Sequence, residues 1–510
     1  MLALGVPAVA FGQRTDVDPS TSPVALSPAD SSNVTTDIAL GAVPNGEASP
    51  ASTVGAPTPN ANSAIEQPRA KPAVPLVGGA ATSHHPDYAP ATPTYLDRAP
   101  VVDEKLAPTQ PTALKETPAS TATATPSNWH FGGYSELLLT TSFYHPDLKT
   151  NDSTYRNTQL DLARFSLFVG TDITKRISFS SEIEFEHGGT GVAREIEGDE
   201  FGEYETEVEK GGEIVLEQAY LEGRPTDWLT LRAGHLLVPV GMTTQYHTPI
   251  LFSSTRRPES ESQILPSIWH ENGVEAGIRA SDFTLRAQLV TGLDSTGFSS
   301  NHWIAGGMQR SFERPQFNDM ATVIAVDYLG VPSAVFGASF YSSGSNRNRP
   351  KRDLYDVSGR VTLGDLHARF QHGPLKLRGL VLLGHLQNAA TITRANASLS
   401  SNLGVSRTAV GSAAYAAWVE VAYDVLSLFL DKASHRLDLF ARFDAYDSMW
   451  RAGADFDNPL LQRRTITTGL NYFPHPRVVT KVEFVSRWLN ENNNWDRRQH
   501  ELNAALGFAL

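Results

Sequence analysis

The sequence predicts an all-β protein, a 16-stranded antiparallel transmembrane β-barrel that follows a disordered N-terminal arm rich in Pro, Ala, Ser and Thr. Three observations support this fold class. Apolar side chains alternate with polar or charged ones in stretch after stretch, the connections between these stretches are alternately short and long, and the chain ends on one more alternating stretch. Each stretch is long enough to cross a bilayer, which takes about 9–11 residues for a tilted strand.

Composition divides the chain into unequal parts. Of the 32 prolines, 18 lie in residues 14–127, whereas all eight tryptophans lie from Trp129 onward. Residues 14–127 carry too little apolar surface to offset the entropy of ordering, so we expect a disordered arm. Residues 1–13, "MLALGVPAVAFGQ", have the apolar core and small residues of a truncated signal peptide. Residues 128–510 form the expected barrel, and the absence of cysteine fits an exported protein.

The stretch "SEIEFEH" shows the alternation most clearly. Successive side chains of a strand point to opposite faces. Ile183 and Phe185 therefore share one face, and Glu182, Glu184 and Glu186 share the other. In a soluble sandwich the charged face would lie outside, whereas in a membrane barrel it would line a water-filled lumen. Alternation by itself leaves both arrangements open.

Sixteen such strands are predicted, and their connections favour the barrel. Short, turn-like links such as "TDITKR", "QHGP" and "FPHP" alternate with long polar ones, at 189–212, 241–271, 294–318, 389–411 and 448–462. Outer-membrane barrels have short periplasmic turns and long external loops. The predicted strands are 131–145, 157–172, 176–188, 213–224, 228–240, 272–281, 282–293, 319–329, 334–343, 355–370, 374–389, 412–427, 434–447, 463–473, 476–490 and 499–510.

The chain end, "HELNAALGFAL", reads as the closing strand of such a barrel. Leu502, Leu506, Phe508 and Leu510 fall on one face of it. Together with the loop pattern, this predicts a location in the bacterial outer membrane, with membrane lipid as a partner.

Four segments between residues 178 and 279 carry a family resemblance. They read "EIEFEHGGTG", "EIVLEQAYLE", "LTLRAGHLLVPVGMTTQYHTPILFSSTRRPE" and "ILPSIWHENGVEAGIR". In combination they resemble the phosphate-selective porin O and P family of Gram-negative bacteria. The resemblance implies a sixteen-stranded porin that is a homotrimer. The matching motif positions are Gly234, Pro239, Gly241, His247, Pro249, Arg257, Pro258, Pro266, Trp269, Glu271 and Gly273.

The segment 241–271 is the candidate pore constriction, since the third external loop of general porins folds into the lumen. Arg256 and Arg257 would then attract anions, because guanidinium groups pair well with oxyanions. Alternatively, the two arginines only pin the loop to wall carboxylates, for which the candidates are Glu182, Glu184 and Glu186. Face assignment adds Arg279 and Arg286 as lumen residues.

The leading functional hypothesis is a porin that lets small hydrophilic solutes or ions, with anions as candidates, diffuse passively through the lumen. One rival is a barrel that anchors or secretes the N-terminal segment, and another is a soluble all-β binding protein. No enzyme motif, cofactor site or metal-ligand spacing is present, so no enzymatic activity, cofactor or metal is predicted. The formal net charge of −13 argues against nucleic acid as a partner.

Overall fold

The computed structural model describes residues 129–510 except 146–153, 189–194, 198–204, 208–212, 310–313, 400–406, 431–434 and 453–456. The predicted signal peptide (1–13) and N-terminal arm (14–127) lie outside the described residues.

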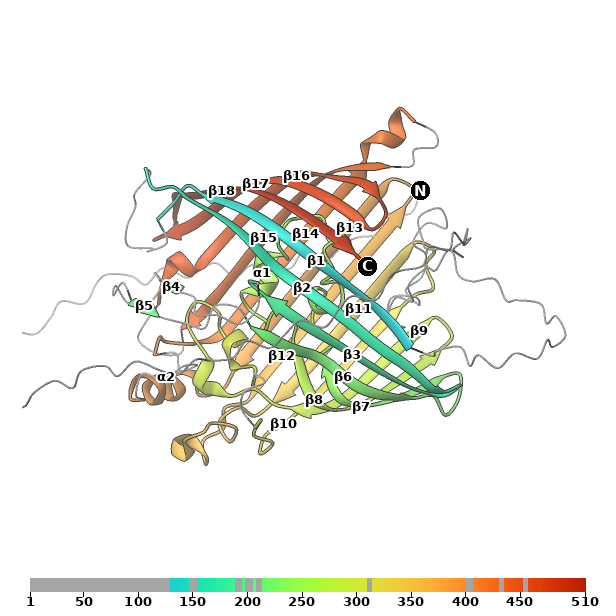
Figure 1. Cartoon of the computed structure of the whole chain (residues 1–510). Coiled ribbons are helices and arrows are strands. Elements are labelled where there is room, and N and C mark those ends of the chain that lie inside the picture. Colours follow the sequence, from blue (N-terminus) through green and yellow to red (C-terminus); the bar gives the residue numbers. More distant parts are fainter. Residues whose placement is uncertain are drawn as a thin grey trace, which may run out of the picture. The chain divides into compact units, whose positions relative to one another are not determined.

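Sixteen of the described strands form one closed antiparallel barrel, as predicted (Figure 1). Each strand pairs with its neighbours along the chain, and β1 (Trp129–Ser142) closes the ring by pairing with β18 (Asn494–Ala509). The others are β2 (Asn157–Thr174), β3 (Ile177–Glu186), β6 (Ile214–Gly223), β7 (Leu229–Leu237), β8 (His270–Ala280), β9 (Phe283–Thr291), β10 (Met320–Tyr328), β11 (Ala334–Ser343), β12 (Val361–His372), β13 (Leu375–Leu386), β14 (Gly411–Asp424), β15 (Arg436–Ala452), β16 (Gln462–His475) and β17 (Val478–Glu491).

Two strands begin at residues other than those predicted, because local hydrogen bonds and turn geometry set where pairing starts. The strand expected from residue 355 begins at Val361, because the preceding residues belong to a packed external loop in which Asn346 Nδ2 donates to the carbonyl of Val357 at 3.0 Å. The last strand begins five residues early, at Asn494. Asn492 and Asn493 both adopt positive φ, 54° and 68°, which permits a two-residue hairpin and continuous pairing up to it.

The remaining described elements are short and lie in the connections. Among the described residues, none of the helices is long and apolar enough to cross a membrane. The strands β4 (Glu195–Glu197) and β5 (Glu205–Glu207) pair with each other, and the helices are η1 (Thr243–Gln245), α1 (Glu259–Ser262), η2 (Ser295–Gly297), η3 (Ala305–Gly307), η4 (Arg352–Leu354), α2 (Ala389–Ala397), η5 (Val425–Leu428) and η6 (Pro459–Leu461).

The two faces of the barrel wall have opposite polarity. In β15, the outward Leu439 and Phe443 are 51% and 42% exposed, whereas the inward Asp438, Arg442 and Asp444 are buried. An apolar outside around a polar inside is the arrangement of a membrane barrel and the reverse of a soluble sandwich. The protein is therefore a transmembrane barrel of the outer membrane, and the soluble binding protein is excluded.

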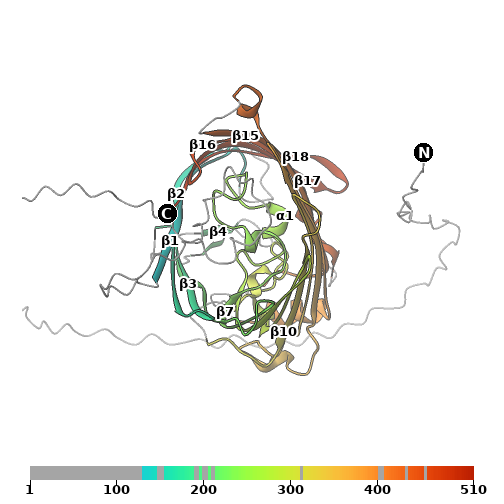
Figure 2. The same ribbon diagram turned by 90° about the vertical axis from the view of Figure 1, so that its right-hand side faces the viewer.

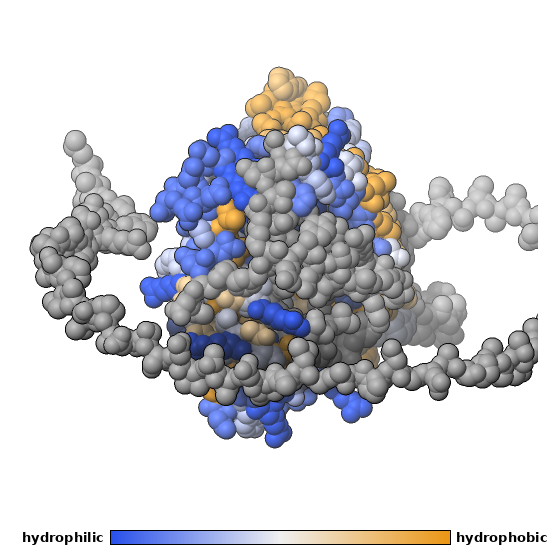
Figure 3. Space-filling model, turned by 90° about the vertical axis from the view of Figure 1, so that its left-hand side faces the viewer, coloured by the Kyte–Doolittle hydropathy of each residue, from blue (hydrophilic) through white to orange (hydrophobic). Residues whose placement is uncertain are grey.

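One connection at the short-turn end is longer than its neighbours. Turns such as 281–282 and 373–374 are tight, but 425–435 separate β14 from β15. Leu428, Phe429 and Leu430 in this connection are 61%, 81% and 45% exposed. Residues 425–430 project beyond the barrel wall in Figure 1 and form the hydrophobic patch at the top of Figure 3.

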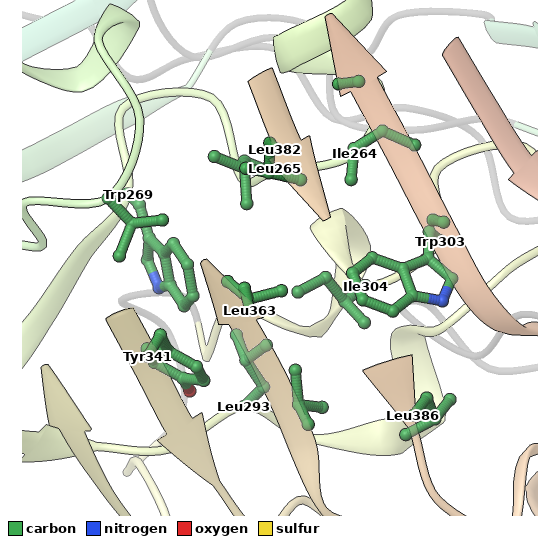
Figure 4. Packing of buried hydrophobic residues seen from close by; sticks show 14 of the residues in the cluster. Ile264, Leu265, Trp269, Leu293, Trp303, Ile304, Tyr341, Leu363, Leu382 and Leu386 are labelled. Atoms are coloured by element: carbon green, nitrogen blue, oxygen red, sulfur yellow. The ribbon is translucent and has the colours of Figure 1, made fainter. Parts of the chain in front are cut away.

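An apolar cluster fills part of the barrel interior toward the long-loop end (Figure 4). Trp303, fully buried, donates from Nε1 to the carbonyl of Gly411 at 2.8 Å. Its ring lies against Gly384 of β13, where an added Cβ would lie 2.1 Å from the indole. Trp269 packs on Tyr341 with ring centroids 4.6 Å apart. The inward face of these strands is therefore not polar throughout, which the sequence analysis did not anticipate.

Candidate functional site

The connection between β7 and β8, residues 238–269, contacts inward-facing side chains on both sides of the barrel. We call it the lumen loop, and Figure 2 shows it with α1 inside the ring of strands. The backbone N–H of Gly241 donates to Asp365 of β12 at 2.9 Å. Ser260 Oγ donates to Asp444 of β15 at 2.8 Å. His247 Nε2 lies 3.2 Å from Glu182 of β3.

Glu261 in α1 connects three parts of the site. Its Oε1 accepts hydrogen bonds from the backbone N–H groups of Met242 and Thr243, at 2.6 and 2.7 Å, and from the Thr243 hydroxyl at 2.9 Å. Its Oε2 accepts one from Trp418 Nε1 of β14 at 2.9 Å. The carboxylate is fully buried, so it holds the start and the helix of the lumen loop together against the wall.

Glu259, two residues earlier, pairs with the wall through a bidentate contact. Arg487 of β17 donates from Nε and Nη2 to its two carboxylate oxygens at 2.7 and 2.9 Å. Tyr446 donates to the same carboxylate at 2.6 Å. Burial alone would raise the pKa of Glu259, but the charge and hydrogen bonds of Arg487, together with Arg463 and the Tyr446 hydroxyl, outweigh burial and lower that pKa to about 2.

The middle of the lumen loop is held by a carboxylate and a lysine of β17. Glu483 of β17 accepts hydrogen bonds from the hydroxyls of Ser254 and Thr255 at 2.7 and 2.6 Å. The buried Lys481 donates to the carbonyls of Phe252 and Ser254 at 2.9 and 2.8 Å. Buried charges of both signs thus replace water on the polar groups of the loop.

Many wall charges are paired, either within one strand, as Arg442 and Asp444 are in β15, or across neighbouring strands. Arg442 lies 2.9 Å from Asp444, and Arg378 lies 2.7 Å from Glu420. Arg232 contacts two carboxylates, Glu222 at 2.8 Å and Glu275 at 2.9 Å. The alternating acids and bases therefore largely neutralise one another along this part of the wall.

The predicted arginines occupy different surroundings. Arg256 has a 52% exposed side chain, donates to Thr140 of β1 at 3.1 Å, and lies 3.9 Å from Glu501 of β18. Arg257 donates to Ser267 within the same loop. Within the described residues, neither arginine forms an ion pair with Glu182, Glu184 or Glu186.

The three predicted wall glutamates also differ in burial and in hydrogen-bond partners. Glu182 is fully buried and accepts from Ser166 at 2.8 Å and Gln218 at 2.7 Å. Glu184, 1% exposed, accepts from the Tyr134 hydroxyl at 2.6 Å. Glu186 is half-buried. Glu182 and Glu184 thus face inward, and the partner of Glu182 from the lumen loop is His247.

Arg279 and Arg286 lie toward the short-turn end. Both line a cavity of about 130 Å³, with Glu275, Asp327 and Arg369 among the other lining residues. Arg279 is exposed, whereas Arg286 is only 8% exposed. They do not meet Arg256 or Arg257 in this cavity.

Sequence reasoning missed the residues that hold the lumen loop most firmly, namely Glu259, Glu261, Glu483 and Arg487. The alternation in "KVEFVSRW" places Lys481, Glu483 and Arg487 on one face, and this signal could have identified them as lumen residues. Nothing in the sequence indicates that Glu259 and Glu261 would meet them.

Comparison with known proteins gives distant matches. No known family profile matches the chain. An uncharacterized protein of Aquifex aeolicus (strain VF5) is 26% identical over 357 residues, which cover 69% of this chain and 74% of that protein.

Solved structures that resemble the chain are outer-membrane proteins of low sequence identity. An anion-selective porin from Comamonas acidovorans is 11% identical, with 75% of this chain and 100% of that chain covered and a TM-score of 0.43. The outer-membrane channel DcaP of Acinetobacter baumannii is 12% identical, with 75% and 97% covered and a TM-score of 0.46. OmpF of Salmonella typhi, in complex with daunomycin, is 12% identical, with 75% and 98% covered and a TM-score of 0.46. Likeness at this level does not assign a function.

Proposed function

We propose that the protein is an outer-membrane porin through which small hydrophilic solutes diffuse passively, past a constriction made by the lumen loop. The observation that supports this most is the attachment of one long loop to inward-facing side chains on β3, β12, β14, β15 and β17. A segment held across the interior leaves a narrower path beside it. The charged wall next to it suits polar solutes rather than apolar ones.

Selectivity in this proposal depends on the few charges that remain accessible. Arg256 is the strongest candidate, because its side chain is half exposed and the carboxylate with which it pairs, that of Glu501, lies 3.9 Å away. Paired wall charges contribute little net field. We therefore propose a modest preference for small anions, and the resemblance to phosphate-selective porins remains part of this proposal.

Planar-bilayer recording of the purified protein tests both statements. The wild type is expected to give steady open channels, and its reversal potential in a salt gradient is expected to favour anions. Arg256→Gln should shift that potential toward cations. Arg347→Gln, which removes the same charge from the external loop before β12, should leave it unchanged. Unaltered selectivity of Arg256→Gln would contradict the role of Arg256 but not the existence of the pore.

A barrel that anchors or exports the N-terminal segment is the second candidate. The apolar cluster around Trp269 and Trp303 favours it, because that cluster fills part of the interior toward the long-loop end. Such a barrel should remain electrically silent in the same bilayers. Open conductance would exclude a permanently plugged anchor.

We further propose that the porin is a homotrimer, as the family resemblance suggests. Light scattering of the detergent-purified protein, corrected for bound detergent, should give three chains per particle. A single chain per particle would contradict this assembly.

A further inference from the structure

Three buried side chains from separate segments meet on the wall side of the lumen loop. They are Glu182 of β3, Glu217 of β6 and His247 of the lumen loop, with exposed fractions of 0%, 3% and 7%. His247 Nε2 lies 3.2 Å from Glu182 Oε1 and 3.7 Å from Glu217 Oε2. These three atoms all lie within 4.8 Å of one another.

We propose that Glu182, Glu217 and His247 bind a divalent transition-metal ion of the Zn²⁺ class. Ligands about 2.0–2.1 Å from a tetrahedral zinc ion lie about 3.3–3.4 Å from one another. The two distances from His247 bracket this value, and they exceed the length usual for a charge-assisted hydrogen bond, about 2.7–2.9 Å. One nitrogen and two carboxylate oxygens suit zinc better than Mg²⁺ or Ca²⁺, which prefer six or more oxygens.

Glu217 supplies an independent reason to expect a cation. Its Oε2 is buried and has no hydrogen-bond partner among the described residues. That oxygen also points at the ring nitrogen of His247 rather than at a hydrogen-bond donor of the wall. An unsatisfied buried carboxylate oxygen is costly, and a second carboxylate beside it increases the cost. A divalent ion between Glu182 and Glu217 would remove both penalties.

The orientation of His247 is that of a metal ligand. Its Nδ1 lies 2.9 Å from the backbone carbonyl oxygen of Thr244, so Nδ1 carries the hydrogen. In the neutral ring Nε2 then presents a lone pair to the two carboxylates. Ligating histidines usually donate their other ring N–H to such a carbonyl group.

A second lumen histidine shows the contrasting arrangement. His367 Nδ1 lies 2.7 Å from Asp365, and its Nε2 lies 3.3 Å from Asp327. Each ring nitrogen thus faces its own carboxylate, which suits a doubly protonated imidazolium. His367 is therefore a matched control, since it is a lumen histidine between two acids without the carbonyl that fixes a metal-binding tautomer.

The surroundings of the three side chains orient one ligand and leave space for a solvent ligand. Ser166 and Gln218 orient Glu182 by donating to its two oxygens. A cavity of about 60 Å³, lined by Glu182, His247 and Gln245 among others, adjoins two of the three ligands. Because a single water needs only about 10–15 Å³ by this measure, a fourth ligand from solvent fits.

Two of the ligands belong to the wall and one to the lumen loop. A bound ion would therefore tie the loop to β3 and β6. Several strands of the ring separate these two from β14, β15 and β17, which hold the loop elsewhere. The binding itself does not depend on porin function. Any effect of the bound ion on conductance rests on the proposed porin function.

The test is zinc binding by the full chain in detergent, after treatment with a chelator and dialysis. The wild type should bind about one Zn²⁺ per chain, with a higher unfolding temperature in ZnCl₂ than in MgCl₂. His247→Ala and the nearly isosteric Glu217→Gln should each weaken binding by at least about 10-fold. His367→Ala should bind as the wild type does.

Equal zinc binding by the wild type and by both site variants would overturn the proposal. So would the absence of binding in a folded wild type, and His247 would then be an imidazolium paired with the two carboxylates. If folded protein binds zinc but forms no channel, the metal site stands and the porin function fails. If channels form but the folded protein binds no zinc, the porin function stands and the metal site fails.

Discussion

Glu261 is the residue on which the path of the lumen loop depends most directly. One oxygen accepts from Met242 and Thr243, and the other accepts from Trp418. A Gln side chain could still accept the hydrogen bonds from Met242 and Thr243 through its amide oxygen, but its NH₂ group, a donor, would then face the Trp418 N–H, which is also a donor. Leaving a buried donor unsatisfied costs about 1–3 kcal/mol.

Glu261→Gln should therefore lower the temperature at which the folded band converts to the unfolded one on heat-modifiability gels. Ser262→Ala is the matched control in the same helix, because the Ser262 hydroxyl donates to the nearby carbonyls of Pro258 and Glu259 and, within the described part of the chain, to no residue of the wall. Equal thermal stability of the two variants would show that the Trp418 contact contributes little.

Glu259 gives the site an acid dependence whose sign follows from its pKa. The pKa falls from an ordinary 4.5 to about 2 in the folded protein. The Arg487 contact therefore stabilises the fold fully above about pH 4.5, and this contribution is lost as pH falls from about 4.5 to about 2. A shift of this size corresponds to at most about 3 kcal/mol.

Glu259→Gln should lose less thermal stability than the wild type when the pH is lowered from 6 to 3. Thermal unfolding followed by circular dichroism measures this difference. If the acid sensitivity of both proteins is identical, the Glu259–Arg487 contact is not its source.

Residue-level prediction succeeded where it needed only the period of a strand. Alternation placed Glu182 and Glu184 on the inward face, and both side chains are buried. It could not place Arg256 near Glu501 or His247 near Glu182, because those contacts depend on the three-dimensional path of a loop. Irregular segments carry no period from which such a path could be read.

At the scale of the strand, the two faces differ in what they tolerate. Phe443 lies on the outward face of β15 and is 42% exposed, and we expect it to contact membrane lipid. Thr284 of β9 lines the interior cavity with Arg279 and Arg286. An arginine facing the hydrocarbon costs about 2–4 kcal/mol near the midplane, and little in a wet lumen.

Phe443→Arg should accordingly reduce the urea concentration at which the barrel unfolds in lipid vesicles, whereas Thr284→Arg should change it little. Comparable losses in both variants would mean that the lipid face has been assigned wrongly. Ile183, Phe185, Leu285, Leu289 and Leu439 are expected to behave like Phe443.

Strands could be predicted as elements because each carries its own pattern, and all sixteen are found. Their ends were harder to place. The start of β18 depends on two asparagines with positive φ, and the start of β12 depends on hydrogen bonds made by the preceding loop. Neither rule predicts the projection of residues 425–430 beyond the wall.

At the scale of the whole molecule, the barrel closes on itself within residues 129–510. β1 and β18 pair from Tyr134 with Ala509 to Ser142 with Glu501, so no strand edge is left for another segment to complete. A chain that lacks residues 14–127 should therefore still fold, with the heat-modifiable migration of the full-length protein. Failure of the shortened chain to fold would show that the arm has a structural role.

A hollow cylinder of sheet is easily flattened, because strand hydrogen bonds resist stretching far better than bending. The lumen loop is bonded to β3 on one side and to β14, β15 and β17 on the other, so flattening the barrel would break buried contacts of Glu182, Glu261, Glu259 and Glu483. The loop thus acts as a strut that sets the cross-section. For the proposed pore, the expected mechanical consequence is a passage whose width stays constant when the thickness or lateral pressure of the surrounding bilayer changes.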